Sequence, residues 1–348
     1  MKTERATACL LGGALGDSLG LPFEGVSPRR IARWLRRRPF GQRFVFGRGM
    51  LSDDTDHAVF TAQALLRAQG DVARFRRVLA WRMRLWLLTL PAGIGLATLR
   101  SLILLWCGVP PTRSGVWSAG NGPLMRAPLI GCKYASDARR RREFVDASTR
   151  ITHRDPQVLT AARALADVAA AIARGDYPRA PAWPELQALL RAAGDEPEWK
   201  AMLLRLGDCF TADDPCKAAR AAFGGPGGIG GYALHTLPFA LAAWHTHHGD
   251  LSATLEAVIR AGGDTDTVGA VAGSLAALSV GCAGIDAGLV DGIADWPHSP
   301  RYLRQLGAAL DDGNASVATG FRAGLWLRSP LFMALVLAHG LRRLLPPY

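Results

Sequence analysis

The chain lacks the cysteine pairs that build disulfide scaffolds and zinc knuckles. Its six cysteines are scattered over 348 residues, and none forms a C-x-x-C pair. This spacing predicts free, buried thiols in a reducing compartment and argues against a disulfide-rich secreted fold. The residues of a sequence motif begin soon after Met1–Arg5, so we expect no signal peptide. We therefore expect a cytoplasmic location.

The chain has few long apolar runs. Residues 85–99 are interrupted by Pro91, and residues 331–341 are too few to span a bilayer. Residues 268–285 carry no charge and reach the usual spanning length, but they consist largely of Gly, Ala and Ser and follow an acidic cluster. We therefore expect a tightly packed, buried helix there and no membrane partner.

Continuous β-branched runs are scarce as well, whereas Ala, Leu and Gly dominate, and this favours helices over sheet. Hydrophobic residues make up 49% of the chain, enough for a sizeable core. Neither a long linker nor a fixed-period repeat divides it. We predict a compact all-α single domain over residues 1–300, with a C-terminal helical extension, residues 301–348, packed on it.

Acidic residues are fewer than basic ones, 29 against 41, which leaves a net charge of +12. A basic balance attracts phosphates, polyanions or acidic protein surfaces, although a GC-rich genome that favours Arg codons explains it equally well. The densest basic run, residues 29–43, holds seven Arg but matches no nucleic-acid motif, so we expect no specific nucleic acid partner. A solvated helix face or a patch for an acidic partner accounts for this run equally well.

Two acidic clusters stand out against this background, Ser52–Asp56 and Gly262–Thr267. Each carries carboxylates and hydroxyls at close spacing and runs into a helix-like segment of small residues. Taken alone, either cluster is an ordinary helix N-cap. Closely packed carboxylates resist burial unless a cation or hydrogen-bond donors offset their charge, and such oxygen ligands suit Mg²⁺, Mn²⁺ or Ca²⁺ better than zinc. Together the clusters predict two halves of one metal site.

Glycine spacing predicts how helices approach one another. Gly12, Gly16 and Gly20 recur every four residues in a predicted helix over 6–20, so they form one stripe that another backbone can approach closely. Further helices are expected over residues 58–68, 72–90, 157–174, 232–244 and 251–260, with connections over 175–197 and 286–300.

Two Gly-rich loops, 118–126 and 224–231, can present backbone N–H groups to phosphate, but neither matches a P-loop or a dinucleotide fingerprint. Arg126 is either a phosphate clamp or, more commonly, a structural residue that satisfies loop carbonyls. His57 is a candidate partner for a carboxylate of the first cluster, and His153 reads as a cap at a helix start. Glu24 is either a solvated surface residue or an acid/base group whose proton affinity is raised by an apolar turn.

Six motifs, in this order, resemble the ADP-ribosylglycohydrolase family, which includes the dinitrogenase-reductase-activating and ADP-ribosyl-acceptor hydrolases. They are GGALGDSLGLPFE (12–24), LSDDTDH (51–57), GNGPLMR (120–126), THRDPQ (152–157), GGYALHTLPFAL (230–241) and GGDTDT (262–267). The resemblance runs from residue 10 to about 285, and residues after about 300 fall outside it.

The resemblance implies metal-dependent hydrolysis of the glycosidic bond between ADP-ribose and an acceptor, with two Mg²⁺ or Mn²⁺ ions in a binuclear site. Arginine is the first choice of acceptor, and serine or another O-linked acceptor is the next. The partner would be an ADP-ribosylated protein or a small molecule that contains ADP-ribose. The implied metal ligands are Ser52, Asp53, Asp54, Asp264, Asp266 and Thr267. The implied catalytic residues are Glu24, Asp53 and Asp266, and the implied ADP-ribose contacts are Gly120, Asn121, Gly122, His153, Gly228, Ile229 and Tyr232.

Three other functions stay open from the sequence. One is a catalytically idle protein that binds ADP-ribose, and another is a two-metal phosphohydrolase. The third is an immunity protein that occludes an ADP-ribosylating effector, with residues 29–43 and the tail after 300 as contact surfaces.

Overall fold

The computed structural model describes residues 4–36, 40–313 and 317–342, and within these ranges every regular element is a helix. The prediction of an all-α fold is confirmed. The α-helices are α1 (Arg5–Gly20), α2 (Pro28–Leu35), α3 (Asp53–Ala68), α4 (Val72–Leu88), α5 (Leu96–Trp106), α6 (Ala127–Lys133), α7 (Ala138–Thr152), α8 (Pro156–Arg174), α9 (Trp183–Arg191), α10 (Pro197–Phe210), α11 (Pro215–Phe223), α12 (Ala233–Thr246), α13 (Leu251–Ala261), α14 (Thr265–Val280), α15 (Ala287–Asp291), α16 (Pro300–Asp312) and α17 (Leu325–Arg342). Three short 3₁₀ helices, η1 (Leu21–Phe23), η2 (Leu124–Arg126) and η3 (Cys282–Gly284), complete the set.

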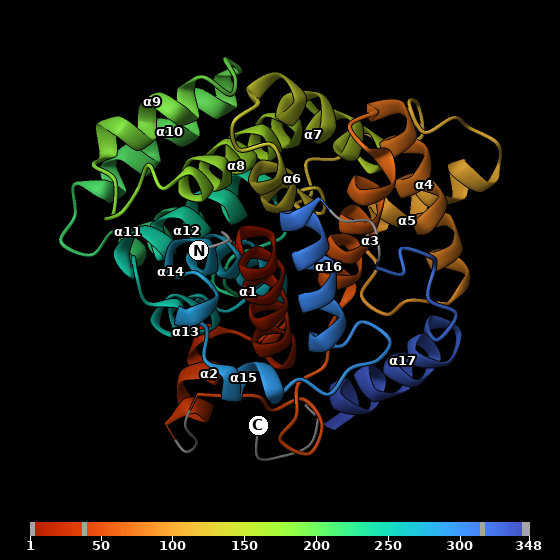
Figure 1. Cartoon of the computed structure of the whole chain (residues 1–348). Helices are drawn as coiled ribbons and strands as arrows, with labels where there is room; N and C mark the ends of the chain where they lie inside the picture. The colour runs from red at the N-terminus through yellow and green to blue at the C-terminus, as the bar shows by residue number, and fades with distance from the viewer. Residues whose placement is uncertain (1–3, 37–39, 314–316, 343–348) are drawn as a thin grey trace.

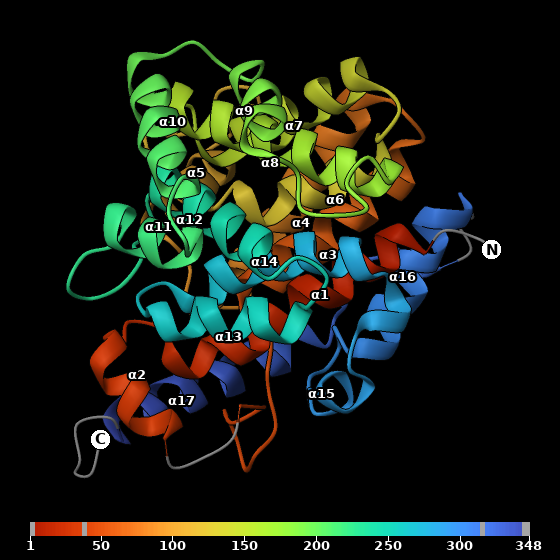
Figure 2. The same cartoon turned by 90° about the vertical axis from the view of Figure 1, so that its left-hand side faces the viewer.

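Helices α1 and α14 pack against each other at the centre of the molecule, and the other helices surround this pair (Figures 1 and 2). Glycines make this contact close. A Cβ atom built on Gly16 would fall on the carbonyl oxygen of Gly269, and one on Gly12 would fall on that of Gly273. Gly20 meets the carbonyl of Thr265 in the same way. The predicted glycine stripe is therefore the surface along which two helices distant in sequence come together.

This contact brings the starts of two helices to the same region. Ser52 is the N-cap of α3, and its side chain accepts a hydrogen bond from the Asp54 backbone N–H at 3.2 Å. Asp264 occupies the N-cap position of α14, directly beyond the point where Gly20 ends α1. Each acidic cluster thus begins a helix, as predicted.

Several predicted segments differ from the structure. The connection expected over 175–197 contains α9, and the one over 286–300 contains the short helix α15. Both helices are short and have Gly or Pro residues within or close to them, so the sequence pattern indicated turns at these positions. The uncharged run over 268–285 forms most of α14, which is buried as predicted. Within the described ranges, no helix combines the length and the hydropathy needed to cross a membrane.

All six cysteines are free, and four of them are buried, while Cys107 is exposed and Cys282 is half-buried. The prediction of buried thiols therefore holds for four of the six positions.

The C-terminal helices pack on the rest of the chain. Leu303 and Leu306 of α16 belong to the main hydrophobic core together with α1. Phe332 of α17 joins a smaller apolar cluster with Phe44 and Met50, and α17 lies at the edge of the molecule in Figure 1. The division into a domain and an extension at residue 300 stays a prediction.

Candidate functional site

A cleft of about 330 Å³ lies where the two acidic clusters meet. Asp53 comes from the start of α3, and Asp264, Asp266 and Thr267 come from the start of α14. The opposite wall consists of the 118–125 loop, residues 93–98 before and within α5, and the His153 ring. Glu24, which follows η1, stands exposed at this cleft. With Gly231, which also lines it, one cavity therefore joins segments from seven parts of the sequence.

Asp54 connects the two clusters. Its Oδ2 atom lies 3.2 Å from the Ser52 hydroxyl and 3.2 Å from the Thr267 hydroxyl, both of which donate to it. Asp54 and Thr267 are 213 residues apart in sequence. Predicted ligands from both clusters therefore meet at one carboxylate oxygen.

Two carboxylate oxygens in this region are buried without a hydrogen-bond partner, Oδ1 of Asp54 and Oδ1 of Asp266. Buried polar atoms in proteins are nearly always paired, because an unpaired one costs about 1–3 kcal/mol. Unpartnered carboxylate oxygens beside hydroxyl groups form a donor set that fits a hard divalent cation. Such a cation would satisfy atoms that the protein itself leaves unpaired.

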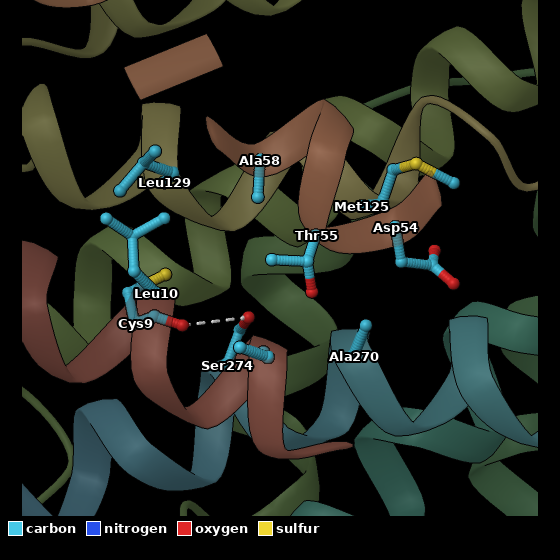
Figure 3. A pocket seen from close by; sticks show the side chains of 11 residues that line it. Cys9, Leu10, Asp54, Thr55, Ala58, Met125, Leu129, Ala270 and Ser274 are labelled. Atoms are coloured by element: carbon cyan, nitrogen blue, oxygen red, sulfur yellow. Dashed lines mark hydrogen bonds between the residues drawn. The ribbon is translucent and has the colours of Figure 1, made fainter. Parts of the chain in front are cut away.

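Asp54 also lines a second, smaller cavity. This cavity, of about 10 Å³, lies between α1, α3 and α14, and Figure 3 shows Asp54 at one end and the apolar side chains of Leu10 and Leu129 at the other. Asp54 is therefore set behind the larger cleft, which Asp53, Asp264 and Asp266 line directly.

The electrostatics of the cluster point the same way. Burial raises the pKa of Asp54 and of Asp266 well above the usual range, and neighbouring carboxylates raise both further. The pKa of Asp53 is raised by burial and then by the charges of Asp17, Glu24 and Asp56. Like charges this close need protons or a cation nearby. Among the described residues, no three or more His, Cys, Asp and Glu side chains are already arranged as a metal-binding group.

Four of the seven expected ADP-ribose contacts line the cleft: Gly120, Asn121, Gly122 and His153. The Asn121 side-chain N–H donates to Asp264 at 2.7 Å and to Thr236 at 2.9 Å, which ties this loop to the second cluster. The loop and the acidic wall are thus parts of one hydrogen-bonded unit.

The other three, Gly228, Ile229 and Tyr232, are not among the residues that line the cleft. Ile229 is fully buried, and its backbone pairs with the Gly262–Asp264 segment, donating to Gly262 at 2.9 Å and accepting from Asp264 at 2.8 Å. The Tyr232 hydroxyl donates to Gln157. In this structure Gly228 and Ile229 lie against the second acidic cluster, whereas Tyr232 contacts α8 through Gln157. The contact of all three with a ligand stays a prediction.

A sequence model of the ADP-ribosylglycohydrolase family matches residues 1–317. The chain belongs to this family. The match extends past residue 285, where the resemblance seen in the sequence ends, and it includes α16.

Relatives of this ADP-ribosylglycohydrolase family member are known from sequence and from structure. An uncharacterised protein of Archaeoglobus fulgidus is 28% identical over 280 residues, 78% of this chain and 86% of that protein. The uncharacterised protein YegU of Escherichia coli K12 is 30% identical over 143 residues, 38% of this chain and 42% of that protein. A chain from a structure described as an ADP-ribosylglycohydrolase-related protein complex superposes with a TM-score of 0.64 and 25% identity, over 89% of this chain and 98% of that one.

The structure corrects two expectations for single residues of this family member. Among the described residues His57 makes no hydrogen bond to a carboxylate: its Nδ1 accepts a hydrogen bond from Arg126 at 3.0 Å, and the histidine that pairs with the first cluster is His298, 2.6 Å from Asp56. His153 does not begin a helix, because it follows α7 and Asp155 caps α8. Glu24 is exposed at the cleft, which agrees with the solvated alternative that the sequence left open for it.

Carboxylates that are not among the predicted ligands hold the first acidic cluster in place. Asp17 of α1 accepts hydrogen bonds from the Ser52 backbone N–H at 2.9 Å and from the Thr55 backbone and hydroxyl. Burial raises the pKa of Asp17 to about 6. Asp295 accepts from the Leu51 backbone N–H at 2.9 Å.

Arg328 of α17 completes this support. It forms an ion pair with Asp295 at 2.7 Å and also donates to the carbonyl of Leu51, so both backbone groups of Leu51 are held. The two side chains are almost fully buried. Sequence reasoning missed Asp295, His298 and Arg328 because each is a single residue without a motif, and only the fold brings them to the cluster. Residues 93–98 in the cleft wall also lie outside every predicted motif.

Proposed function

We propose that this chain hydrolyses the glycosidic bond between ADP-ribose and a modified acceptor, with ADP-ribosyl-arginine on protein as the first substrate and ADP-ribosyl-serine as the second. Family membership supports a glycohydrolase. The observation that carries the proposal is the meeting of both acidic clusters at Asp54, with unpartnered carboxylate oxygens beside a cleft of about 330 Å³.

The residues that would hold two Mg²⁺ or Mn²⁺ ions are Ser52, Asp53, Asp54, Asp264, Asp266 and Thr267. When bound, such ions lower the pKa of a water molecule and orient sugar hydroxyls. The protein supplies the remaining elements: Asn121 holds Asp264 in place, and the 118–125 loop forms the wall opposite the carboxylates.

Cleavage of a glycosidic bond develops positive charge at the anomeric carbon and needs a proton for the leaving group. The carboxylates of the cleft wall favour that positive charge. Glu24 is exposed at the cleft and close enough to raise the pKa of Asp266 and Asp53, so it is our candidate for proton transfer. Asp53 and Asp266 then act chiefly as ligands.

Hydrolysis of mono-ADP-ribosylated arginine and serine peptides tests the proposal directly. We expect Mg²⁺-dependent release of intact ADP-ribose. This release should be lost in EDTA and in an Asp53→Asn/Asp264→Asn variant. The peptide that is hydrolysed faster identifies the linkage that the protein cleaves. Chromatography of the products separates this from phosphohydrolase activity, which would give AMP and ribose phosphate. Binding of ADP-ribose without any release would instead indicate a binding or blocking protein.

Glu24→Gln should lower turnover about 100-fold, because a positioned acid/base group contributes at least that factor. The affinity for Mn²⁺, measured by calorimetry, should stay within about twofold, since the change leaves the six proposed ligands intact. Glu256→Gln, at a partly exposed residue on α13 that pairs with Arg260, is the matched control and should leave both quantities unchanged. Parent-like turnover in Glu24→Gln would remove Glu24 from proton transfer.

A further inference from the structure

Arg126 is a fully buried arginine whose contacts are hydrogen-bond acceptors without formal charge. Its guanidinium donates to the Ser148 hydroxyl at 2.9 Å, to the Ser148 carbonyl at 3.3 Å, to the Thr152 hydroxyl at 2.9 Å and to Nδ1 of His57 at 3.0 Å. Among the described residues it takes part in no ion pair. An arginine only donates hydrogen bonds, so each of these partner atoms is fixed as an acceptor.

Because the Thr152 hydroxyl accepts from Arg126, its own O–H remains available as a hydrogen-bond donor. It lies 2.9 Å from Nδ1 of His153 and 3.5 Å from the carbonyl of Thr149. The first distance suits a strong hydrogen bond from a hydroxyl and the second is too long for one. The hydroxyl thus accepts from Arg126 and donates to His153.

His153 is held on its backbone side as well. Its N–H donates to Thr149 at 2.9 Å, and its neighbours Thr152 and Arg154 pair with the backbone of Val116. Burial, and then the nearby Arg126 charge, lower the pKa of His153 to about 3, so the ring is neutral at physiological pH. A neutral ring carries one proton, and an Nδ1 that accepts leaves this proton on Nε2.

The Nε2 side of the ring faces the cleft. A Cβ atom at position 120 would lie 3.3 Å from Nε2, and one at position 122 would lie 3.2 Å from Cε1. His153 is only 2% exposed, and the missing side chains at positions 120 and 122 allow this edge of the ring to reach the cleft. The 118–125 loop at this wall carries no acidic side chain of its own.

We propose that Arg126 and Thr152 fix His153 in the form with its proton on Nε2, so that the Gly120–Gly122 wall offers an N–H donor to a phosphate oxygen of the ligand. This deepens the proposed function, on which its ligand half rests, because Gly120–Gly122 and His153 are already its expected ADP-ribose contacts; the new element is the pair of buried residues that orients the His153 ring. Arg126 and Thr152 are positioning residues, and the buried guanidinium adds positive potential beneath the anion. His153 is the residue that touches the ligand.

The test combines a spectroscopic measurement with binding. Protein labelled with ¹⁵N-histidine is measured by two-bond ¹H–¹⁵N correlation, and the His153 signals are identified by their loss in His153→Gln. We expect an unprotonated Nδ1 and a protonated Nε2 in the parent chain and in Thr152→Ser. In Thr152→Val the hydroxyl is absent, so the preference for this form should be lost.

Binding of ADP and adenosine, measured by calorimetry in EDTA, gives the second readout. Thr152→Val should weaken ADP binding about 5- to 10-fold, as expected for one hydrogen bond, and leave adenosine binding unchanged, while Thr152→Ser restores the parent value. Thermal unfolding checks that each variant is folded. If Thr152→Val does not fold, Arg126→Lys is measured in its place and should show the same weakening of ADP binding.

A proton on Nδ1 in the parent chain would overturn the relay. Equal weakening of ADP and adenosine, or no ADP binding by the parent, would overturn the assignment of the phosphate. A hydrolysis assay that fails while the Nε2 form and ADP binding are both present would overturn the proposed function and leave this inference standing.

Discussion

Asp266→Asn is expected to unfold at a higher temperature than the parent chain in EDTA and to lose metal-dependent turnover about 10³-fold. Asp266 is buried, its Oδ1 has no partner, and the charges of Glu24, Asp264 and Asp54 all oppose its ionisation. Removing an uncompensated buried charge should stabilise the metal-free fold by about 2 kcal/mol. The same substitution removes a proposed ligand, so stability and activity change in opposite directions.

The pH dependence of the metal-free parent gives an independent check on this repulsion. A carboxyl group whose pKa is raised on folding binds its proton more tightly in the folded state, so stability falls as the pH rises. For Asp17 the loss should fall between pH 3.8, the ordinary pKa of the group, and about 6, its raised pKa in the folded protein. Thermal unfolding in EDTA should therefore show lower stability at neutral pH than at acidic pH, and saturating Mn²⁺ should reverse this loss at neutral pH.

The control for Asp266→Asn is Asp250→Asn, which makes the same chemical change at the start of another helix. Asp250 caps α13 through the Ala253 backbone N–H at 2.8 Å and is exposed, and asparagine caps a helix equally well. Its unfolding temperature and its response to Mn²⁺ should match the parent. A lower unfolding temperature for Asp266→Asn in EDTA would show that the carboxylate is stabilised by the protein alone.

Gly16→Ala is expected to destabilise the chain by about 4 kcal/mol or to prevent folding. The new Cβ would coincide with the carbonyl oxygen of Gly269, and the backbone atoms around it belong to two central helices that cannot move apart without disturbing the core. Denaturation in urea, together with the yield of folded protein, measures the effect. Because α1 and α14 position the two acidic clusters, any folded fraction should also bind Mn²⁺ less tightly.

Gly340→Ala is the matched control, because it is the same substitution inside a helix. Gly340 is exposed in α17, and nothing lies within 4 Å of the position that a Cβ would take. Alanine favours a helix by about 1 kcal/mol over glycine, so this variant should be slightly more stable than the parent. Comparable losses in both variants would mean that the α1–α14 contact tolerates a side chain.

The features that the sequence predicted best are those with a local signal. The glycines of α1 recur every helical turn, and the acidic clusters sit at helix starts where Ser and Asp are favoured. The sequence also predicted that the two clusters meet in one site, because closely packed carboxylates resist burial unless a cation or hydrogen-bond donors offset their charge. The order of six motifs then made the family recognisable.

The parts that the sequence did not predict depend on pairing at a distance. Nothing near His298 or Arg328 in the sequence indicates that one contacts Asp56 and the other holds Leu51. The helix over Trp183–Arg191 was hidden because Pro and Gly residues surround it. Arg126 was predicted to be structural more often than a phosphate clamp, and its burial confirms this, but its link through Thr152 to His153 required coordinates.

The separation of 213 residues between Asp54 and Thr267 also has a consequence for synthesis on the ribosome. A chain emerging from its N-terminus exposes α1 and the first acidic cluster long before α14 exists, so the glycine face of α1 has no partner during most of translation. The nascent protein therefore has to keep this face from other contacts, and a cation cannot be captured by half of its ligands. Metal binding would then be among the last events of maturation, and occupancy of the site would report that the whole chain has folded.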